Sequence, residues 1–568
     1  MRFRKLSIFT VSLAIASAGL FSCKKLVEVT PQDVLDAKNA YQNVYDANAA
    51  VMGAYGKLMS LASNYVILNE LRADLLTTTE NADEYLRQLS EHNVQANNPY
   101  ASPRPFYEVI VNCNDVLYNF NRMLREKKLK QTEYDMRYAD ITALRTWVYL
   151  QVGIHFGTVP YVTDPLSTND DIRNISLMPR ITFNELLSNL IVTMESLPYL
   201  EPYTSSPTLI TTVDGYNTNN FFINKKALLG ELYLWRSQPG DYRKAAQAFK
   251  SVMETGGAGQ LYQLRLTGSS KADNNDLAVG YVRYREEDEG MLVDNNGQGW
   301  RSIFARGQDA LFNYEWIWFL PYDNTLFKPE NPFINLFSPR GGSYLLKPSQ
   351  SAMNRWNRQV QKNDFPYDAR GGVFSYRTLG GNPVVMKYLY NYLAGTGFTP
   401  VSLLEKKGKW FLYRAATLHL EFAEAANRDD HHYLADRLLN QGFLGTNLNN
   451  NEGFPYNFDG RKSDNPRIAA DWCMNSGIRG RANLYSAPVV GDSTIALENN
   501  IISESALELA YEGKRWPDLL RIALRRNDPA FLADRIYDKL LRENNGQAAA
   551  VRAKLMNKDN WYLPFKWE

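Results

Sequence analysis

The chain has 568 residues, 45% of them hydrophobic and 22% charged, which is the composition of a globular protein with a large core. Its 63 basic and 61 acidic residues leave a net charge of +2. This balance argues against a nucleic-acid-binding protein and against electrostatic steering to an anionic membrane. Aromatic residues make up 13% of the chain and must serve as core or as a surface on which a ligand stacks.

The first 22 residues have the pattern of an export signal. Arg2, Arg4 and Lys5 form a basic start, and an apolar segment over 6–20 follows it. This segment is too short to span a bilayer. We therefore expect a signal peptide over 1–22.

Cys23 ends the sequence Leu-Phe-Ser-Cys, which is similar to a bacterial lipobox. In a lipobox the cysteine is lipidated on its thiol and becomes the mature N-terminus, so we expect a lipid anchor on Cys23 and a polar tether over 23–40. An ordinary signal peptide that happens to contain a cysteine is the alternative. Cys113 and Cys473 are expected to be free core residues, with a single bridge between them left open.

The stretch 138–166 changes character at Gly157. Before it, apolar residues cover nearly the whole circumference of a helix, which predicts a helix surrounded by protein. Pro160 and Pro165 prevent the helix from resuming and keep the next segment extended. The polar stretch 71–105 predicts a long loop that can carry function. Apolar residues at helical spacing predict further helices over 41–61, 106–124, 182–197, 220–235 and 242–253.

The last two of these helices form a pair with a recognisable repeat pattern. Leu229-Gly230-x-x-Tyr233 followed by Ala245-x-x-x-Phe249 matches the second half of a tetratricopeptide motif, with small residues where helices cross. A degenerate repeat and a plain helical hairpin both remain open.

From 255 to 399 the chain is rich in Gly, Pro, Asn and aromatic residues, which predicts a loop-rich insertion. Short strand-like runs occur at 278–284 and 314–320. The tail over 561–568 is apolar and is expected to pack back on the body. Helices are predicted over 410–426, 433–439 and 501–511, the last continuing toward Leu524, and a polar loop over 447–471.

Five separated stretches resemble the SusD/RagB family of outer-membrane nutrient-uptake lipoproteins, in the family's order. The resemblance implies a mostly α fold, with a tetratricopeptide-like helix-pair scaffold and a large loop-rich irregular lobe containing short strands. The stretches are RTWVYLQVGIHFGTVPYVTDPL (145–166), KKALLGELYLWRSQPGDYRKAAQAF (225–249), YRAATLHLEFAEAANR (413–428), GIRGR (477–481) and ESALELAYEGKRWPDLLR (504–521).

The resemblance also implies a division of the chain, a partner and a ligand. A helical repeat region over 41–254 precedes a ligand-contacting lobe over 255–400 and a C-terminal helical region over 401–568. The partner is a SusC-like TonB-dependent transporter, and the ligand is an oligosaccharide or, in the RagB branch, a peptide. The protein would face outward on the outer membrane, although Lys24 and Lys25 replace the acidic run often associated with surface export.

The sequence carries none of the zinc-protease, serine-hydrolase or phosphate-loop motifs, so we expect a non-enzymatic protein without a cofactor. His155 and His419 fall within predicted helices and are expected to be core residues. The acidic and histidine cluster over 429–432 is interpreted as a solvated turn rather than a metal site. The acidic run 286–289 is interpreted as a solvated loop rather than a glycosidase pair. The segment 294–297 (Asp-Asn-Asn-Gly), which resembles part of a calcium loop, is interpreted as a turn.

Binding a sugar requires flat aromatic faces and polar side chains on loops, because a sugar ring has an apolar face and a rim of hydroxyls. Trp316 and Trp318 share one strand face and are assigned to the core. A helical glycoside hydrolase and a repeat scaffold without ligand remain alternatives to an oligosaccharide or peptide binder. The candidate contacts are Asp74, Asn97 and Tyr100, in the region that resembles the family's N-terminal contribution, and Tyr322, Phe327, Phe333 and Tyr344 in the lobe.

Overall fold

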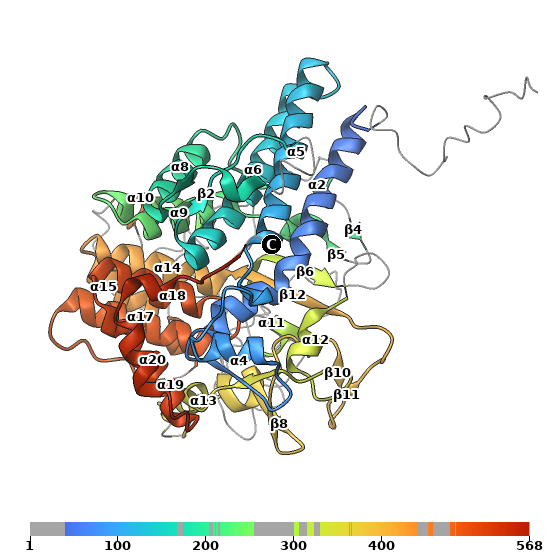
Figure 1. Cartoon of the computed structure of the whole chain (residues 1–568). Helices are drawn as coiled ribbons and strands as arrows, with labels where there is room; N and C mark the ends of the chain where they lie inside the picture. The colour runs from blue at the N-terminus through green and yellow to red at the C-terminus, as the bar shows by residue number, and fades with distance from the viewer. Residues whose placement is uncertain are drawn as a thin grey trace, which may run out of the picture.

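Helices dominate the computed structural model, and its strands are short and join only in two-stranded sheets within the residues described (Figure 1). The predicted mostly α fold class is therefore confirmed. The structure describes residues 40–166, 174–203, 208–210, 212–213, 216–254, 300–305, 315–322, 330–362, 364, 366–440, 442, 453–457, 477–482 and 484–566.

Three long helices build the N-terminal part. α2 (Val44–Leu58), α5 (Arg104–Arg125) and α6 (Gln131–Phe156) pack on one another close to their predicted bounds. Every residue of α6 from Ala139 onward is buried, as its all-round apolar pattern predicts. The helix ends at Gly157, whose φ of +70° favours glycine. Short elements follow α2: η2 (Met59–Leu61), α3 (Ala62–Val66) and η3 (Ile67–Leu71).

The prediction of one long loop over 71–105 is wrong, because three short elements divide this stretch. α4 (Glu84–Ser90) starts at Asp83, whose carboxylate accepts from the backbone N–H of Leu86. β1 (Leu76–Thr78) pairs with β7 (Leu346–Pro348), and η4 is Pro99–Ala101. α4 has only seven residues, and the partner of β1 lies far along the chain. Elements this short leave too little periodicity in the sequence for a helix or a strand to be predicted.

The predicted helix pair is present as α9 (Lys225–Arg236) and α10 (Asp241–Glu254). Gly230 lies at their crossing, where an added Cβ would come within 2.5 Å of the Phe249 ring. α9 also packs on α8 (Phe183–Glu195), so the pair belongs to a stack of helices. Connecting elements in this region are β2 (Val159–Pro160), η5 (Asn174–Leu177), β3 (Arg180–Ile181), β4 (Thr212–Val213), β5 (Tyr216–Asn217) and η6 (Thr218–Phe221).

The lobe is described from Trp300 onward, so the predicted strand 278–284 lies outside the described residues. The predicted strand 314–320 is confirmed as β6 (Trp316–Tyr322), and Trp316 and Trp318 are buried as expected. The other lobe elements are α11 (Ser302–Ala305), α12 (Pro332–Phe337), α13 (Gln350–Asn357), η8 (Arg370–Ser375), β8 (Tyr376–Leu379), β9 (Asn382–Val385), β10 (Leu393–Ala394) and β11 (Thr399–Pro400).

The predicted helix 410–426 is wrong in its first part. β12 (Gly408–Arg414) pairs antiparallel with β6, and only then does α14 (Ala415–Arg428) begin. All residues of β12 are buried, and a short apolar run buried on both faces has no period that separates a strand from a helix.

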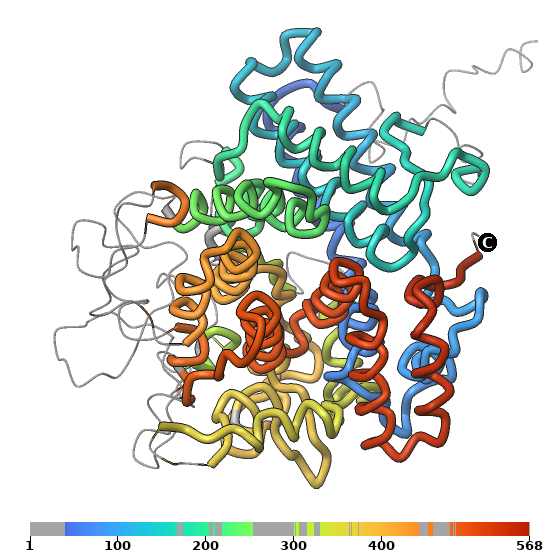
Figure 2. The backbone as a smooth tube through the Cα atoms, turned by 90° about the vertical axis from the view of Figure 1, so that its left-hand side faces the viewer, coloured from blue at the N-terminus to red at the C-terminus, as the bar shows by residue number. Residues whose placement is uncertain are grey.

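The C-terminal helices lie beside the N-terminal segment that carries α4, as the tube in Figure 2 shows. Lys539 Nζ fixes this contact by donating to the Leu71 carbonyl at 2.9 Å. The bounds are α15 (His432–Leu439), α16 (Ile478–Arg481), α17 (Ser493–Glu508), α18 (Arg515–Arg526), α19 (Pro529–Arg542), α20 (Ala548–Leu555) and η10 (Lys558–Trp561).

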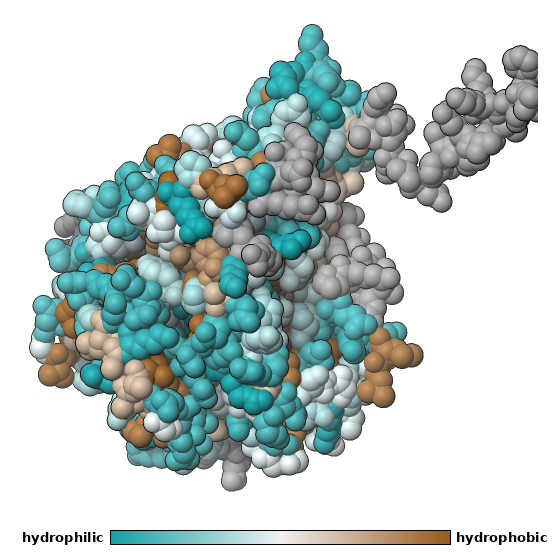
Figure 3. Space-filling model, in the orientation of Figure 1, coloured by the Kyte–Doolittle hydropathy of each residue, from teal (hydrophilic) through white to brown (hydrophobic). Residues whose placement is uncertain are grey.

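The tail packs back on the body, which confirms the prediction for this segment as far as Lys566. Trp561 is fully buried, and the Leu563 N–H donates to the His155 carbonyl at 2.9 Å. In Figure 3 the visible face is largely hydrophilic, with small separate apolar patches. None of the described helices combines the length and the apolar character needed to span a membrane.

Candidate functional site

Glu70 connects the N-terminal region to the start of α18. Its Oε1 accepts from the backbone N–H groups of Gly513 (2.7 Å) and Lys514 (3.0 Å), and its Oε2 accepts from that of Tyr511 (3.2 Å). Burial raises the pKa of Glu70 to about 8, while these N–H groups act in the opposite direction. Lys514 offers no side-chain cap to α18, and the distant Glu70 instead accepts from N–H groups of the turn that leads into this helix and of its N-cap.

Asp74 lies one turn further on and is fully buried. Its carboxylate accepts from Arg515 Nε at 2.6 Å and from Arg355 Nη2 at 2.6 Å. Burial would raise the pKa of Asp74, but Arg515 and Arg355 bring it well below its ordinary value. The structure thus places this predicted ligand contact in a buried ion cluster that joins the turn after η3 to α13 and α18.

Asn97 and Tyr100, the other two predicted contacts in this region, lie at the surface. Asn97 is exposed, and the half-buried Tyr100 donates from its hydroxyl to Asp83 Oδ2 at 3.1 Å. Burial and the neighbouring Asp83 raise the pKa of Tyr100 to about 12. We call Asp83, Asn97 and Tyr100 the α4 ledge. It combines a flat ring with a carboxylate and an amide, the groups that a sugar requires.

The two predicted contact regions meet in the fold. Thr77 in β1 faces Lys347 in β7, and beyond the strands Asn81 Nδ2 donates to the Ser343 carbonyl at 3.1 Å. The Thr79 hydroxyl donates to the Tyr344 carbonyl. The ledge is therefore held against the lobe by a short sheet and by side-chain hydrogen bonds.

Three of the predicted lobe aromatics form core rather than surface. Tyr322, Phe333 and Tyr344 are 1%, 0% and 3% exposed. The hydroxyls of Tyr322 and Tyr344 donate to the carbonyls of Met59 (2.9 Å) and Pro383 (2.8 Å), and Phe333 stacks on Tyr388 with ring centroids 4.1 Å apart. In this structure they offer no face to a ligand, and Phe327 lies outside the described residues.

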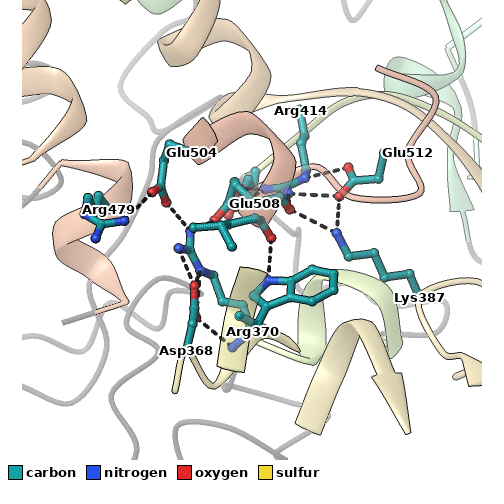
Figure 4. Close-up of polar contacts among 11 residues, drawn as sticks. Asp368, Arg370, Lys387, Arg414, Arg479, Glu504, Glu508 and Glu512 are labelled. Atoms are coloured by element: carbon teal, nitrogen blue, oxygen red, sulfur yellow. Dashed lines mark hydrogen bonds and ion pairs between the residues drawn. The ribbon is translucent and has the colours of Figure 1, made fainter. Parts of the chain in front are cut away.

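A buried network of charges fixes the lobe to α17 (Figure 4). Arg370 Nη1 contacts Glu504 at 2.6 Å and Glu508 at 2.7 Å. Arg414 Nη1 contacts the other oxygen of Glu508 at 2.7 Å. We call this set the lobe–helix network; its members are Glu315, Asp368, Arg370, Lys387, Arg414, Arg479, Glu504, Glu508 and Glu512.

Sequence reasoning did not find this network, although one signal was present. Glu504, Glu508 and Glu512 recur at four-residue spacing, which places carboxylates along one side of a helix. Arg370, Lys387 and Arg414 lie between 94 and 138 positions away from these carboxylates, and no local pattern identifies partners so distant. The network positions the lobe, and of its members only Arg479, with a side chain 15% exposed, reaches the surface.

The cluster over 429–432 is a turn with partners of its own, as interpreted. Asp429 accepts from Tyr456 Oη at 2.7 Å and from Arg243 Nε at 3.1 Å. His432 Nδ1 lies 2.9 Å from Asn427 Oδ1. In the part of the chain that the structure describes, no group of three or more His, Cys, Asp or Glu is arranged to hold a metal ion. The runs 286–289 and 294–297 lie outside it.

His155 and His419 are core residues, which confirms their interpretation. His155 Nδ1 accepts from Arg72 Nη1 at 3.2 Å, and burial lowers the pKa of His155 well below its usual value. His419 Nδ1 donates to the Ala415 carbonyl at 2.6 Å. Cys113 is a buried free thiol whose pKa burial raises to about 12, and Cys473 lies outside the described residues.

Comparisons with known proteins agree with this architecture. Residues 349–566 match the model of the SusD family. A SusD superfamily protein from Bacteroides vulgatus shares 13% identity over 89% of this chain and 93% of its own, with a TM-score of 0.56. The fold of the chain is SusD-like. No curated protein matches it in sequence.

Two other solved structures share the SusD-like fold and have names that state a ligand. The surface glycan-binding protein A from Bacteroides uniformis is 15% identical over 92% of this chain and 96% of its own, with a TM-score of 0.53. A laminarin-binding SusD-like protein is 16% identical over 92% of this chain and 97% of its own, with a TM-score of 0.55. Identities this low establish the fold and leave the ligand to be argued from the site.

Proposed function

We propose that this SusD-like protein is a non-enzymatic cell-surface lipoprotein that binds oligosaccharides and passes them to a SusC-like TonB-dependent transporter of the outer membrane. The observation that carries the proposal is the fold match over 92% of the chain to proteins named for glycan and laminarin binding. The SusD family match over 349–566 supports it independently.

The α4 ledge is the proposed ligand-contacting surface. The Tyr100 ring can stack on the apolar face of a sugar, while Asn97 and Asp83 can pair with hydroxyls at its rim. The hydrogen bond from Tyr100 to Asp83 fixes the ring before a ligand arrives, which lowers the entropy cost of binding. Asp74, Tyr322, Phe333 and Tyr344 support the ledge and the lobe from beneath, and Phe327 remains a proposed contact.

Attachment to the membrane rests on Cys23 in this proposal. Radiolabelled palmitate should be incorporated into the wild-type protein in cells and lost in Cys23→Ala. Retained labelling in this variant would contradict the lipid anchor.

The partner is tested by copurification, because a SusC-like transporter should accompany the wild-type protein from detergent-solubilised outer membranes.

A glycan and peptide array followed by titration calorimetry tests the ligand. Tyr100→Ala should weaken oligosaccharide binding by about tenfold, the loss of one well-stacked aromatic contact. Tyr118→Ala, which removes a ring that is 48% exposed on α5, is the matched control and should bind as the wild type does. Binding of peptides alone would favour a peptide carrier, turnover of the glycan would favour a hydrolase, and no ligand at all would favour a scaffold.

A further inference from the structure

A cleft of about 790 Å³ opens between the helical scaffold and the C-terminal tail, and we call it the scaffold cleft. Its walls come from the end of α6, the start of α8, the end of α9, the α18 helix and the tail beyond Lys558. The tail lies on the near face of Figure 1, where the C-terminus is marked. A volume of this size suits a ligand of two or three rings.

Aromatic rings from the scaffold and from the tail line the scaffold cleft. Phe183 and Trp235 meet edge to face with centroids 5.5 Å apart, and Phe156 meets Phe565 of the tail at 5.2 Å. Tyr562 covers Gly157, where an added Cβ would lie 2.9 Å from the Tyr562 ring. Phe156, Phe183 and Trp235 are 4%, 7% and 6% exposed, so the partly buried rings of Tyr562 and Phe565 offer the larger faces on which a sugar ring can stack.

The polar part of the lining is strongly cationic. Its charged residues are five cations and a single acid, Asp559. Arg236 pairs with Asp241, and Arg521 with Glu424, both behind the wall. The cations are Arg180, Arg236, Arg521, Arg525 and Lys558.

Arg180 stands apart from these pairs. It is exposed, its guanidinium lies 5.8 Å from the centre of the Phe565 ring, and no carboxylate among the described residues pairs with it. Thr182, Phe183 and Asn184 also line the cleft at the first turn of α8, where the helix dipole is positive.

Three buried donor nitrogens, on two side chains of the wall, lack an acceptor among the described residues. They are Nε1 of Trp235 and both Nε and Nη1 of Arg525. Each side chain is only 6% exposed. Arg525 uses only its Nη2, which donates to Glu424 at 2.8 Å and also to Glu498. Buried N–H groups without a partner are costly, so the lining has unused capacity for acceptor atoms.

We propose that the scaffold cleft binds a uronic acid unit of an acidic oligosaccharide. Its carboxylate is held by Arg180 and by the unpaired donors of Arg525 and Trp235, and its ring lies against the aromatic walls. A carboxylate supplies two acceptor oxygens with full charge, which matches a planar guanidinium better than a neutral hydroxyl does. Thr182, Asn184 and Ser237 are suited to the remaining hydroxyls.

The cleft also lies close to the α4 ledge. The Lys566 N–H donates to the Ala96 carbonyl at 3.1 Å, so the tail that forms one wall is joined to the segment that carries Asn97. The inference rests on the proposed function, because it assigns an acidic sugar to a protein already proposed to bind oligosaccharides.

Calorimetry with a glucuronic-acid-containing disaccharide and its neutral glucose counterpart tests the inference. The wild type should bind the acidic sugar about tenfold more tightly, the effect of one charge-assisted hydrogen bond. Arg180→Gln should abolish this preference by weakening the binding of the acidic sugar about tenfold. Trp235→Phe, which keeps a ring but removes the indole N–H, should reduce the preference in part.

Arg104→Gln is the matched control, because Arg104 is an exposed arginine on α5 with a side chain 66% exposed. It should retain the full preference, and thermal unfolding should show that every variant is folded. Equal affinity for both sugars, an unchanged preference in Arg180→Gln, or tighter binding of a peptide carboxylate would each overturn the inference.

The same experiment separates the two proposals. If neutral oligosaccharides bind and Tyr100→Ala weakens them, but the acid gives no preference, only the uronic acid assignment fails. If no saccharide binds the wild-type protein, the proposed function fails and the assignment fails with it.

Discussion

Glu70 is a single residue whose charge state should be visible in the stability of the protein. Burial raises its pKa to about 8, above the value near 4.3 expected for an unfolded chain. At pH values between these two pKa values, the carboxyl group of Glu70 is protonated in the folded state and ionised in the unfolded state. The contribution of Glu70 therefore falls as pH rises from about 4 to 8, by up to about 1.4 kcal/mol per pH unit.

Glu70→Gln removes this titration and keeps an acceptor for most of the N–H groups. Denaturant unfolding at several pH values should show the wild type losing stability relative to Glu70→Gln as pH rises from 5 to 8. Glu70→Ala leaves the N–H groups at the start of α18 without an acceptor and should cost about 3 kcal/mol. Glu108→Gln, at a half-exposed carboxylate, is the control, and an equal pH slope in wild type and Glu70→Gln would contradict the argument.

At the element scale, local patterns predicted long helices well and short or paired elements badly. α6 has a continuous apolar surface, so its burial and its end at Gly157 could be predicted. β12 could not, because its partner β6 lies some ninety positions earlier and its apolar run has no distinguishing period. Distant partners also limited the prediction of the site. Tyr322 and Tyr344 resemble loop aromatics in the sequence, and they are buried because distant segments pack on them and supply carbonyl groups that accept from their hydroxyls.

The C-terminal tail should act as a structural element rather than a loose end. Trp561 is fully buried, donates from its indole to the Leu555 carbonyl at 2.7 Å, and accepts from Arg72 at its own carbonyl at 2.6 Å. Trp561→Ala should cost about 3–5 kcal/mol, as for other buried large aromatics, measured by denaturant unfolding. Phe565→Ala, at a partly buried ring, should cost less, and a loss below about 1 kcal/mol in Trp561→Ala would mean that the tail is dispensable.

For the whole molecule, the order of five sequence stretches predicted the SusD-like architecture. The buried ion pairs that hold its parts together could not be predicted from the sequence. Arg370, Lys387 and Arg414 meet the carboxylates of α17 and the turn after it only in the folded chain. Asp74 illustrates the same point at the site. Its region was identified, yet Arg355 and Arg515, which define its environment, come from positions far along the sequence.

The lobe–helix network should make the lobe and the C-terminal helices unfold as one unit. Arg370→Met leaves Asp368, Glu504 and Glu508 buried without their main cation, which should cost about 3–5 kcal/mol. Hydrogen exchange measured by mass spectrometry should then show reduced protection both in β8 of the lobe and in α17. Because the network joins α17 to Asp368 and Arg370, which lie in the lobe just before β8, weakening it lowers the free energy of the opening that exposes either part.

Arg542→Met is the matched control, since Arg542 and its partner Asp538 are 31% and 44% exposed and a surface pair contributes about 0–1 kcal/mol. Its exchange pattern should match that of the wild type. If Arg370→Met loosens β8 alone and leaves α17 protected, the lobe opens independently of the scaffold, and the buried charges position it without coupling the two parts.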